Sequence, residues 1–259
     1  MSTRTNRRKF LGITAGCAAS LALGTSSPRL SDGSVRPTRV KAVIFDAFPI
    51  FDPRPVPALT EELFPGHGAE FSDLWRDRQF EYCWLRTVGK NYQDFWQVTE
   101  EALVFAAQNL QLDLTAEKRS RLMDSYLALK PWPDVVAVLD SLTNAGIRLG
   151  FLSNITAKML DACIKASGLD GRFEHVLSTD TLKTYKPDPR SYAMGVEAFG
   201  LKREEIIFVA FAGWDAAGSK WFGYPTYWAN RRRQSAAEMG VAPNQTANDL
   251  SGLMTFVQS

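Results

Sequence analysis

The sequence lacks the features that mark several classes of protein. It has only 3 cysteines in 259 residues, and their spacing is not that of a metal site. It has no internal repeats and no excess of either charge, since 30 Lys+Arg stand against 28 Asp+Glu. The composition therefore gives no reason to expect nucleic-acid binding, and we interpret the basic run Arg231–Arg233 as a solvated loop.

What the chain does have is enough apolar residues to bury a sizeable core. Hydrophobic residues make up 45% of it and aromatic residues 12%, which fits one domain with a large insertion or two modest domains. Cys83 and Cys163 lie far apart in the sequence, and we interpret both as buried thiols. A disulfide between them in an oxidising compartment is left open at this point.

The first residues of the chain have the pattern of a targeting segment. Asn6–Leu11 resembles the twin-arginine export signal, and the mildly apolar stretch Gly12–Leu23 that follows is too short to span a bilayer. Ala22–Gly24 offers a cleavage site, with a lipid anchor on Cys17 as the weaker alternative. We expect residues 1–35 to be a signal peptide and linker, and the mature protein to be periplasmic without stable membrane insertion.

The stretch Ala42–Phe45 leads directly into Asp46 and organises the rest of the chain. A short, unbroken apolar run that contains β-branched residues is typical of a strand buried on both faces. Open α/β sheets bind their ligands at the carboxyl ends of such strands. We therefore expect Asp46 at the mouth of a crevice; the alternative is that it only caps the next segment.

Helical periodicity replaces the strand pattern after Asp46. Apolar residues recur at helical spacing over 71–85 and 92–110, and Thr115 can cap a third helix. We see no convincing strand in residues 55–130, and about a hundred residues separate Asp46 from the next strand, far more than a βα connection needs. This predicts a helical cap inserted after the first strand. We expect regular structure to be broken by Pro49, Pro53, Pro55 and Pro57.

Strands then alternate with helices along the remaining chain. Strands are predicted at Arg148–Leu152, at His175–Ser178, at Ile206–Ala210 and, as the last one, at Thr226–Trp228. Such alternation predicts a doubly wound, Rossmann-like α/β core with a parallel sheet. The core would comprise residues 36–54 and 131–259, and the cap residues 55–130.

Polar side chains follow the strands of this predicted sheet. Asp46, Ser153-Asn154, Lys186 and Asp215 should meet at one edge, because parallel strands deliver their carboxyl ends to the same side. Each alone could be a turn, loop or capping residue. Together they favour a site that combines two carboxylates, a cation and a small polar pair.

With these residues in place, the chain resembles the haloacid dehalogenase superfamily and, within it, the L-2-haloacid dehalogenases. The resemblance runs from about Val40 to the C-terminus. It is carried by Phe45–Phe48, Leu74–Arg76, Trp84–Arg86, Leu152–Asn154, Tyr185–Asp188 and Trp214–Ala216.

The resemblance implies hydrolysis of short (S)-2-haloacids to 2-hydroxy acids through an ester on Asp46. Lys186 would hold the nucleophile and Asp215 would orient or activate water. Arg76, with Asn154 beside it, would bind the departing halide. No cofactor is expected, and the partner would be a small 2-halocarboxylate; related enzymes are often dimers, so a homodimer is possible.

Further residues would complete the binding site. Ser153 would take the substrate carboxylate, and Tyr192 matches an active-site tyrosine of the family, although packing on the core is an equal alternative. Phe48 and Trp214 would wall the pocket, unless they are plain core. Phe48 and Phe211 occupy places where phosphatases of the superfamily carry metal-site acids, so no metal is expected.

The chain departs from the family pattern at three polar positions. Pro49-Ile50 stands where Gly-Thr is usual, and Ala210 and Ala212 stand where a serine and an asparagine are usual. The residues that form the ester are present, whereas those that help to cleave it are fewer. Two alternatives therefore stay open, a phosphatase-like hydrolase of the same superfamily and a non-catalytic binder of small carboxylates.

Overall fold

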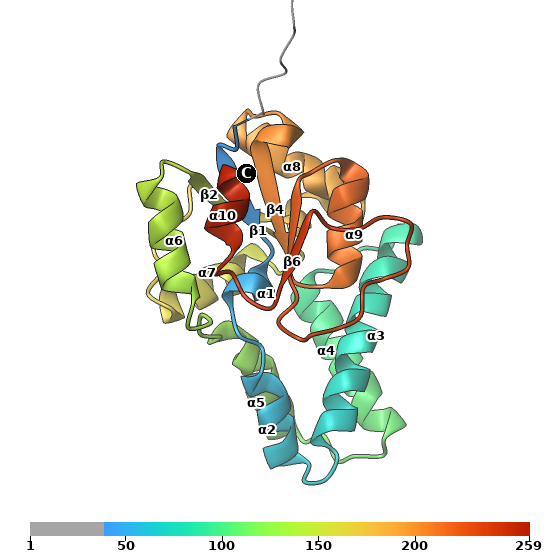
Figure 1. Cartoon of the computed structure of the whole chain (residues 1–259). Coiled ribbons are helices and arrows are strands. Elements are labelled where there is room, and N and C mark those ends of the chain that lie inside the picture. Colours follow the sequence, from blue (N-terminus) through green and yellow to red (C-terminus); the bar gives the residue numbers. More distant parts are fainter. Residues whose placement is uncertain (1–38) are drawn as a thin grey trace, which may run out of the picture. The chain divides into compact units, whose positions relative to one another are not determined.

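A parallel six-stranded sheet lies at the centre of the computed structural model, which describes residues 39–259 (Figure 1). Its strands follow the order β3-β2-β1-β4-β5-β6. The predicted signal peptide and linker lie outside the described residues. The strands are β1 Ala42–Phe45, β2 Arg148–Ser153, β3 His175–Ser178, β4 Ile206–Ala210, β5 Thr226–Ala229 and β6 Gln245–Ala247.

The strand order creates a switch point beside β1. The chain passes from β1 to β2 and β3 on one side and then crosses to β4, β5 and β6 on the other. Phe45 is in register with Phe151 of β2 and Val209 of β4, so Asp46 leaves the sheet between these two strands. This is the crevice where doubly wound sheets bind ligands, and the predicted fold class is confirmed.

Helices cover both faces of the sheet. Val43 and Phe45 point to the face that is covered by helices α6, α7 and α10, whereas Ala42 and Ile44 point to the face that is covered by α8 and α9. This alternation follows from the two-residue period of a strand, and it explains why β1 is apolar at every position. The helices are α6 Val135–Asn144, α7 Ala157–Ala166, α8 Pro189–Phe199, α9 Gly213–Phe222 and α10 Leu253–Gln258.

Four of the six α-helices between β1 and β2, namely α2 to α5, form what we call the cap, drawn below the sheet in Figure 1. Within residues 55–130, all of which are described, there is no strand, as the sequence predicted. The division of the chain at residues 54 and 130 stays a prediction. The cap helices are α2 Pro55–Leu63, α3 Gly68–Val88, α4 Phe95–Asn109 and α5 Ala116–Asp124, the last followed by a 3₁₀ turn at Ser125–Leu127.

Two expectations about secondary structure are wrong. Three of the four prolines do not break regular structure, because Pro49 lies inside the short helix α1 (Ala47–Ile50) and α2 begins with Pro55 and contains Pro57; only Pro53 lies between the two helices, as expected. The first turn of a helix tolerates proline, since its N–H groups have no partner within the helix. Thr226–Trp228 does not hold the last strand, because Gln245–Ala247 adds β6 at the edge of the sheet. That strand is short and mostly exposed, so it has no apolar pattern to detect.

The remaining expectations concern thiols and membranes. Cys83 and Cys163 are both buried and free, which confirms the interpretation as thiols rather than a disulfide. Burial raises the pKa of the Cys163 thiol to about 11. Among residues 39–259, no helix combines the length and the apolar character needed to cross a bilayer.

Candidate active site

Asp46 lies at the end of β1 with one carboxylate oxygen engaged and the other comparatively free. Its Oδ1 accepts hydrogen bonds from Lys186 Nζ at 2.9 Å and from Ser153 Oγ at 3.1 Å. Within the described part of the chain, its Oδ2 accepts a single long hydrogen bond, 3.4 Å, from the N–H of Phe48, so the residue also caps α1. The side chain lines a cavity, and Oδ2 is therefore the oxygen available for reaction.

Lys186 joins two carboxylates in the interior. Its side chain is 1% exposed, and Nζ lies 2.9 Å from Asp46 Oδ1 and 2.6 Å from Asp215 Oδ2. Burial opposes the charge on the amine, but the two carboxylates outweigh it, so the pKa of Lys186 is raised. The cation therefore holds Asp46 in place and offsets the repulsion between the two acids.

Asp215 lies in the first turn of α9, where the N-terminal end of the helix favours a negative charge. Its Oδ1 accepts a hydrogen bond from the hydroxyl of Tyr192 at 2.7 Å, and its Oδ2 accepts from Lys186. Burial raises the pKa of Asp215 to about 6, against the opposing effect of Lys186 and with a further contribution from the charge of Asp46. A carboxylate in this range suits general base catalysis near neutral pH.

Tyr192 supports Asp215 from the core side. The residue is fully buried in α8 and is not among those that line the cavity. Burial and the charge of Asp215 raise its pKa well above the usual range, so the hydroxyl stays a donor. The arrangement favours a role in orienting Asp215 over contact with a substrate.

Ser153 is the last residue of β2 and Asn154 follows it; both line the cavity together with Asp46. The hydroxyl of Ser153 is committed to Asp46 rather than directed at a substrate carboxylate, in contrast to the expectation from the resemblance. The amide oxygen of Asn154 accepts from the backbone N–H of Lys186 at 2.8 Å and from the hydroxyl of Thr179 at 3.2 Å. Its buried Nδ2 has no partner among residues 39–259, so it can donate into the cavity.

Aromatic side chains form the wall of the cavity, which has a volume of about 1140 Å³. Phe48 and Phe211 contact each other at 5.6 Å between ring centroids, beside Asp46. Trp214 of the core contacts Phe80 and Trp84 of α3 at 5.3 and 5.6 Å. Core and cap therefore enclose a largely apolar space, in which ionic interactions are stronger than in water.

The aromatic pair also bears on metal binding. Phe48 and Phe211 offer no oxygen ligand at the place where hard cations such as Mg²⁺ would need several. Within the described range 39–259, no group of three or more His, Cys, Asp or Glu side chains is arranged to hold a metal ion.

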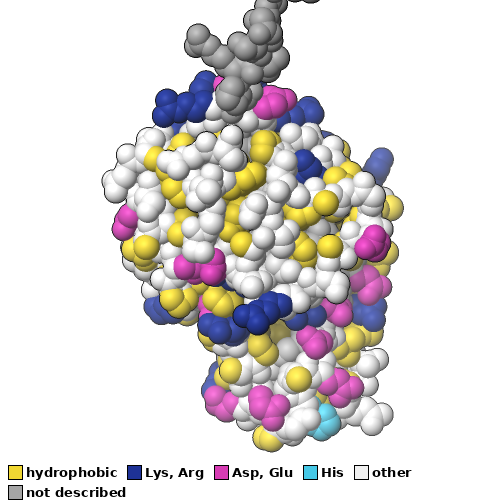
Figure 2. All heavy atoms as spheres, viewed as in Figure 1, with side chains coloured by type: hydrophobic (Ala, Val, Ile, Leu, Met, Phe, Trp, Pro, Cys, Tyr) yellow, Lys and Arg dark blue, Asp and Glu magenta, His cyan; other side chains and the backbone are white. Residues whose placement is uncertain are grey.

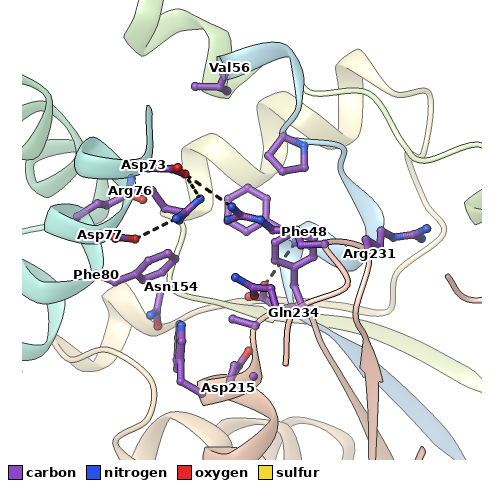
Figure 3. A pocket seen from close by; sticks show the side chains of 18 of the residues that line it. Phe48, Val56, Asp73, Arg76, Asp77, Phe80, Asn154, Asp215, Arg231 and Gln234 are labelled. Carbon is purple, nitrogen blue, oxygen red and sulfur yellow. Dashed lines mark hydrogen bonds and ion pairs between the residues drawn. The ribbon is translucent and has the colours of Figure 1, made fainter. Parts of the chain in front are cut away.

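Arg76 reaches the cavity from the cap helix α3 (Figure 3). Its guanidinium pairs with Asp73 and with Asp77, both at 3.0 Å, and its side chain is 31% exposed. The two acids are mostly exposed, so they hold the arginine at the mouth without enclosing it. A ligand anion in the cavity would compete with them for the guanidinium.

The basic run after β5 is not a solvated loop, and this expectation is corrected. The side chain of Arg231 is only 4% exposed, because it pairs with both oxygens of Asp134 at 3.0 Å. Arg232 is 38% exposed and also lines the cavity, so of the three arginines only Arg233 is exposed and away from it. A run of like charges carries no local signal that its members face different partners.

Arg231 and Trp132 hold the turn that follows Asp46, and no sequence pattern indicated this role for either residue. Trp132 donates its indole N–H to the carbonyl of Phe48 and its backbone N–H to that of Ile50, both at 3.0 Å. Arg231 donates to the carbonyl of Pro49 at 2.8 Å and stacks on Trp132 at 4.6 Å. All three carbonyls at the end of α1 are thus bound, which fixes the helix that Asp46 caps.

The three departures from the family pattern lie around this centre. Ile50 is buried in the core, Ala210 ends β4, and Ala212 precedes α9 at the cavity without a side-chain cap for the helix. None of these side chains can donate or accept a hydrogen bond. Asp215 is therefore the polar side chain that α9 presents beside Asp46.

Comparisons with known proteins agree with this geometry. The family model described as haloacid dehalogenase-like hydrolase matches residues 39–223. The chain is 40% identical over 221 residues to an (S)-2-haloacid dehalogenase of Pseudomonas sp. (strain YL), covering 85% of this chain and 95% of the relative. It is 36% identical to haloacetate dehalogenase H-2 of Moraxella sp. (strain B), covering 85% and 98% of the two chains.

Solved structures give the same result at the level of the fold. The L-2-haloacid dehalogenase RSc1362 matches with a TM-score of 0.84 and 41% identity, covering 86% of this chain and all of the other. The enzyme of Xanthobacter autotrophicus with chloropropionic acid covalently bound matches with a TM-score of 0.78 and 31% identity, covering 85% and 99%. On this sequence and structural similarity, the chain belongs to the haloacid dehalogenase-like hydrolase family.

Proposed function

We propose that this protein hydrolyses (S)-2-haloacids to 2-hydroxy acids, with Asp46 as the nucleophile. The observation that carries the proposal is the asymmetry of its carboxylate. Lys186 and Ser153 fix Oδ1, whereas Oδ2 accepts one long hydrogen bond among residues 39–259, and the side chain lines a largely apolar cavity. A partly desolvated carboxylate held in this way is a good nucleophile.

In the first step Asp46 Oδ2 attacks the halogen-bearing carbon of the substrate. The bond from oxygen to carbon forms as the bond from carbon to halogen breaks, and the halide leaves with the electron pair. The free Nδ2 of Asn154 and the guanidinium of Arg76 are the donors at hand for the halide and for the substrate carboxylate. The charge of Lys186 offsets the repulsion between nucleophile and anionic substrate.

In the second step water attacks the carboxyl carbon of the ester, and Asp215 accepts the proton. Asp215 then returns this proton to the departing alkoxide oxygen, so that the 2-hydroxy acid leaves, and the carboxyl group of Asp46, now with one oxygen from water, loses its own proton to solvent. Because Ala210 and Ala212 offer no hydrogen bond to that water, its placement depends on Asp215 and backbone groups. We therefore propose that ester hydrolysis is the slow step.

The test is a single turnover in H₂¹⁸O with excess enzyme and (S)-2-chloropropionate. The label should enter the protein first, on the peptide that contains Asp46, and the ester should be visible by intact-protein mass. Asp46→Asn should abolish both ester and halide release, because an amide is a poor nucleophile. Label that appears directly in the hydroxy acid, with Asp46 unlabelled, would assign the attack to water and refute this mechanism.

The same assay separates the two alternatives. Halide release that is unaffected by EDTA fits a cavity walled by Phe48 and Phe211, whereas loss of activity that Mg²⁺ restores would revive the phosphatase-like reading. Tight binding of 2-hydroxy acids without any ester would identify a non-catalytic binder. We also propose export to the periplasm, for which the twin-arginine-like Asn6–Leu11 is the support, and a homodimer, which analytical ultracentrifugation would test.

A further inference from the structure

The loop that follows β5 brings a second arginine to the mouth of the cavity. Arg232 lies on this core loop, lines the cavity and approaches Asp73 of the cap helix α3 at 3.8 Å. Gln234 and Ser235 of the same loop also line the cavity, so the loop forms part of its wall. On the face seen in Figure 2, Lys and Arg side chains gather where the core meets the cap.

Arg232 is the least compensated of the arginines that line the cavity. Arg54 forms a bidentate pair with Asp52, and Arg231 forms one with Asp134. Arg76 has Asp73 and Asp77, each at 3.0 Å. Within residues 39–259, Arg232 has one carboxylate, at 3.8 Å, and that carboxylate is shared with Arg76. Among the described residues, the arginines that line the cavity are Arg54, Arg76, Arg231 and Arg232.

Arg76 and Arg232 therefore place two guanidinium groups around one aspartate. Burial, and then the charge of Arg76, lower the pKa of Arg232, while Asp73 and Asp77 oppose this effect. Asp73 is 63% exposed and Asp77 71%, so both can turn to solvent when a ligand anion takes their place. A carboxylate that enters from the cavity would gain a planar donor fork that is only partly exposed to solvent.

The size of the cavity gives such an anion room. Its volume of about 1140 Å³ exceeds the roughly 300–1,000 Å³ that is typical of sites for much larger ligands than a three-carbon acid. A short 2-haloacid would occupy only the end near Asp46. The rest of the space reaches the loop of Arg232, and a longer substrate would extend toward it.

We propose that Arg232 is a specificity-determining residue that binds a second carboxylate of the substrate, so that the preferred substrates are halogenated dicarboxylic acids. The reacting end would occupy Asp46, Asn154 and Arg76, and the distal carboxylate would pair with Arg232 in place of Asp73. This inference rests on the proposed dehalogenation for its chemistry, but the binding site itself does not depend on it.

The test compares (S)-2-bromo dicarboxylic acids of four to six carbons with the (S)-2-bromo monocarboxylic acids of the same length. For the wild-type protein, kcat/KM should favour at least one dicarboxylic acid. Arg232→Gln should lower that preference by about ten- to a hundredfold, the effect of one charge-assisted hydrogen bond, mainly through KM. Arg232→Lys should retain part of the preference, because it keeps the charge and loses the fork.

Arg233→Gln is the matched control, because Arg233 is the exposed neighbour and does not line the cavity. It should leave the preference unchanged. An equal loss for both substrate classes in Arg232→Gln would make Arg232 a link between core and cap, and would overturn the proposal. An absence of any preference for dicarboxylic acids in the wild-type protein would overturn it as well.

A binding measurement separates this proposal from the proposed chemistry. Calorimetry with the (S)-2-hydroxy acids of both classes needs no turnover. Tighter binding of a hydroxy dicarboxylic acid, lost in Arg232→Gln and kept in Arg233→Gln, would support the site even if no halide were ever released. Equal binding of both classes would refute the site while leaving the dehalogenase activity intact.

Discussion

At the scale of single residues, the site is an arrangement of three charges in the interior. Lys186 lies between Asp46 and Asp215 at 2.9 and 2.6 Å, and none of the three is more than 12% exposed at its side chain. Breaking such a buried group by removing one member is costly, because it leaves an uncompensated charge. The charges are therefore a condition of the fold as well as of the chemistry.

Asp215→Asn should separate the two chemical steps. The amide cannot accept a proton from water, so ester formation should persist while ester hydrolysis slows by about a hundredfold or more, the usual range for a general base. Quenched reactions followed by intact-protein mass should show the ester accumulating. Tyr192→Phe, which removes only the hydrogen bond to Asp215, should show a smaller accumulation. Slower ester formation without accumulation would assign Asp215 to the first step.

Arg76→Lys should slow the first step more than it weakens binding. Lysine keeps the charge but loses the planar fork, and the loss of one charge-assisted hydrogen bond corresponds to about a ten- to a hundredfold decrease in rate. Burst kinetics of halide release should therefore show a lower rate with KM little changed. Arg78→Lys, on the same helix but outside the cavity, is the control. An unchanged burst rate of halide release would show that the guanidinium of Arg76 does not assist the first step.

At the scale of elements, the short helix α1 depends on residues far away in the sequence. Trp132 and Arg231 bind the carbonyls of Phe48, Pro49 and Ile50. A four-residue helix has almost no stability of its own, because few of its hydrogen bonds are internal. Its geometry, and with it the position of Asp46, is therefore set by tertiary contacts.

Arg231→Lys should loosen this helix. The substitution keeps the charge but cannot hold Asp134 and the carbonyl of Pro49 at the same time, so the free energy of unfolding should fall by about 1.5–3 kcal/mol. Urea denaturation would measure the change, and kcat should fall with it because Asp46 is less well oriented. Arg233→Lys should change neither quantity. An unchanged free energy of unfolding in Arg231→Lys would mean that the hydrogen bonds of Trp132 alone are enough to hold helix α1.

The same elements show what the sequence could and could not predict. The strands near Asp46 have strong apolar patterns, and the rule that parallel strands end at one edge was enough to bring Asp46, Ser153, Lys186 and Asp215 together. The roles of Trp132 and Arg231 could not be predicted, because their partners are backbone carbonyls 84 and 182 residues away. No local pattern marks such contacts, and none marks a three-residue exposed edge strand.

At the scale of the whole molecule, the cavity exists only because core and cap meet. Trp214 of α9 contacts Phe80 and Trp84 of α3, and Arg232 of the core approaches Asp73 of the cap. Tyr92 of the cap also donates to Asp180 of the core at 2.8 Å. A change in how the cap sits would therefore alter substrate access and the charge at the mouth together.

Export belongs to this scale too, since it concerns the whole chain. Arg7→Lys combined with Arg8→Lys should leave the precursor in the cytoplasm, because the twin-arginine pathway requires the paired guanidinium groups. Cell fractionation followed by immunoblotting would measure the distribution. Arg4→Lys, a change in the same basic segment, should not affect it. Unchanged accumulation in the periplasm of the double variant would contradict the export proposal.

The three-charge centre has one more consequence, which concerns timing. In the proposed mechanism, esterification would remove the negative charge of Asp46, and with it the repulsion that helps to raise the pKa of Asp215 to about 6. Lys186 then faces a single carboxylate, so Asp215 binds its proton less tightly in the ester than in the resting protein.

In the proposed mechanism, formation of the ester would therefore keep Asp215 ionised down to a lower pH, at the step where it acts as the base. A carboxylate is active only above its pKa, so ester decay should persist as the pH falls through 6 and should decline only at lower pH. Rapid-quench measurements of ester decay between pH 4 and 8, spanning roughly two pH units on either side of that pKa, would locate the decline. A decline at pH 6 or above would show that Asp215 does not respond to the charge on Asp46.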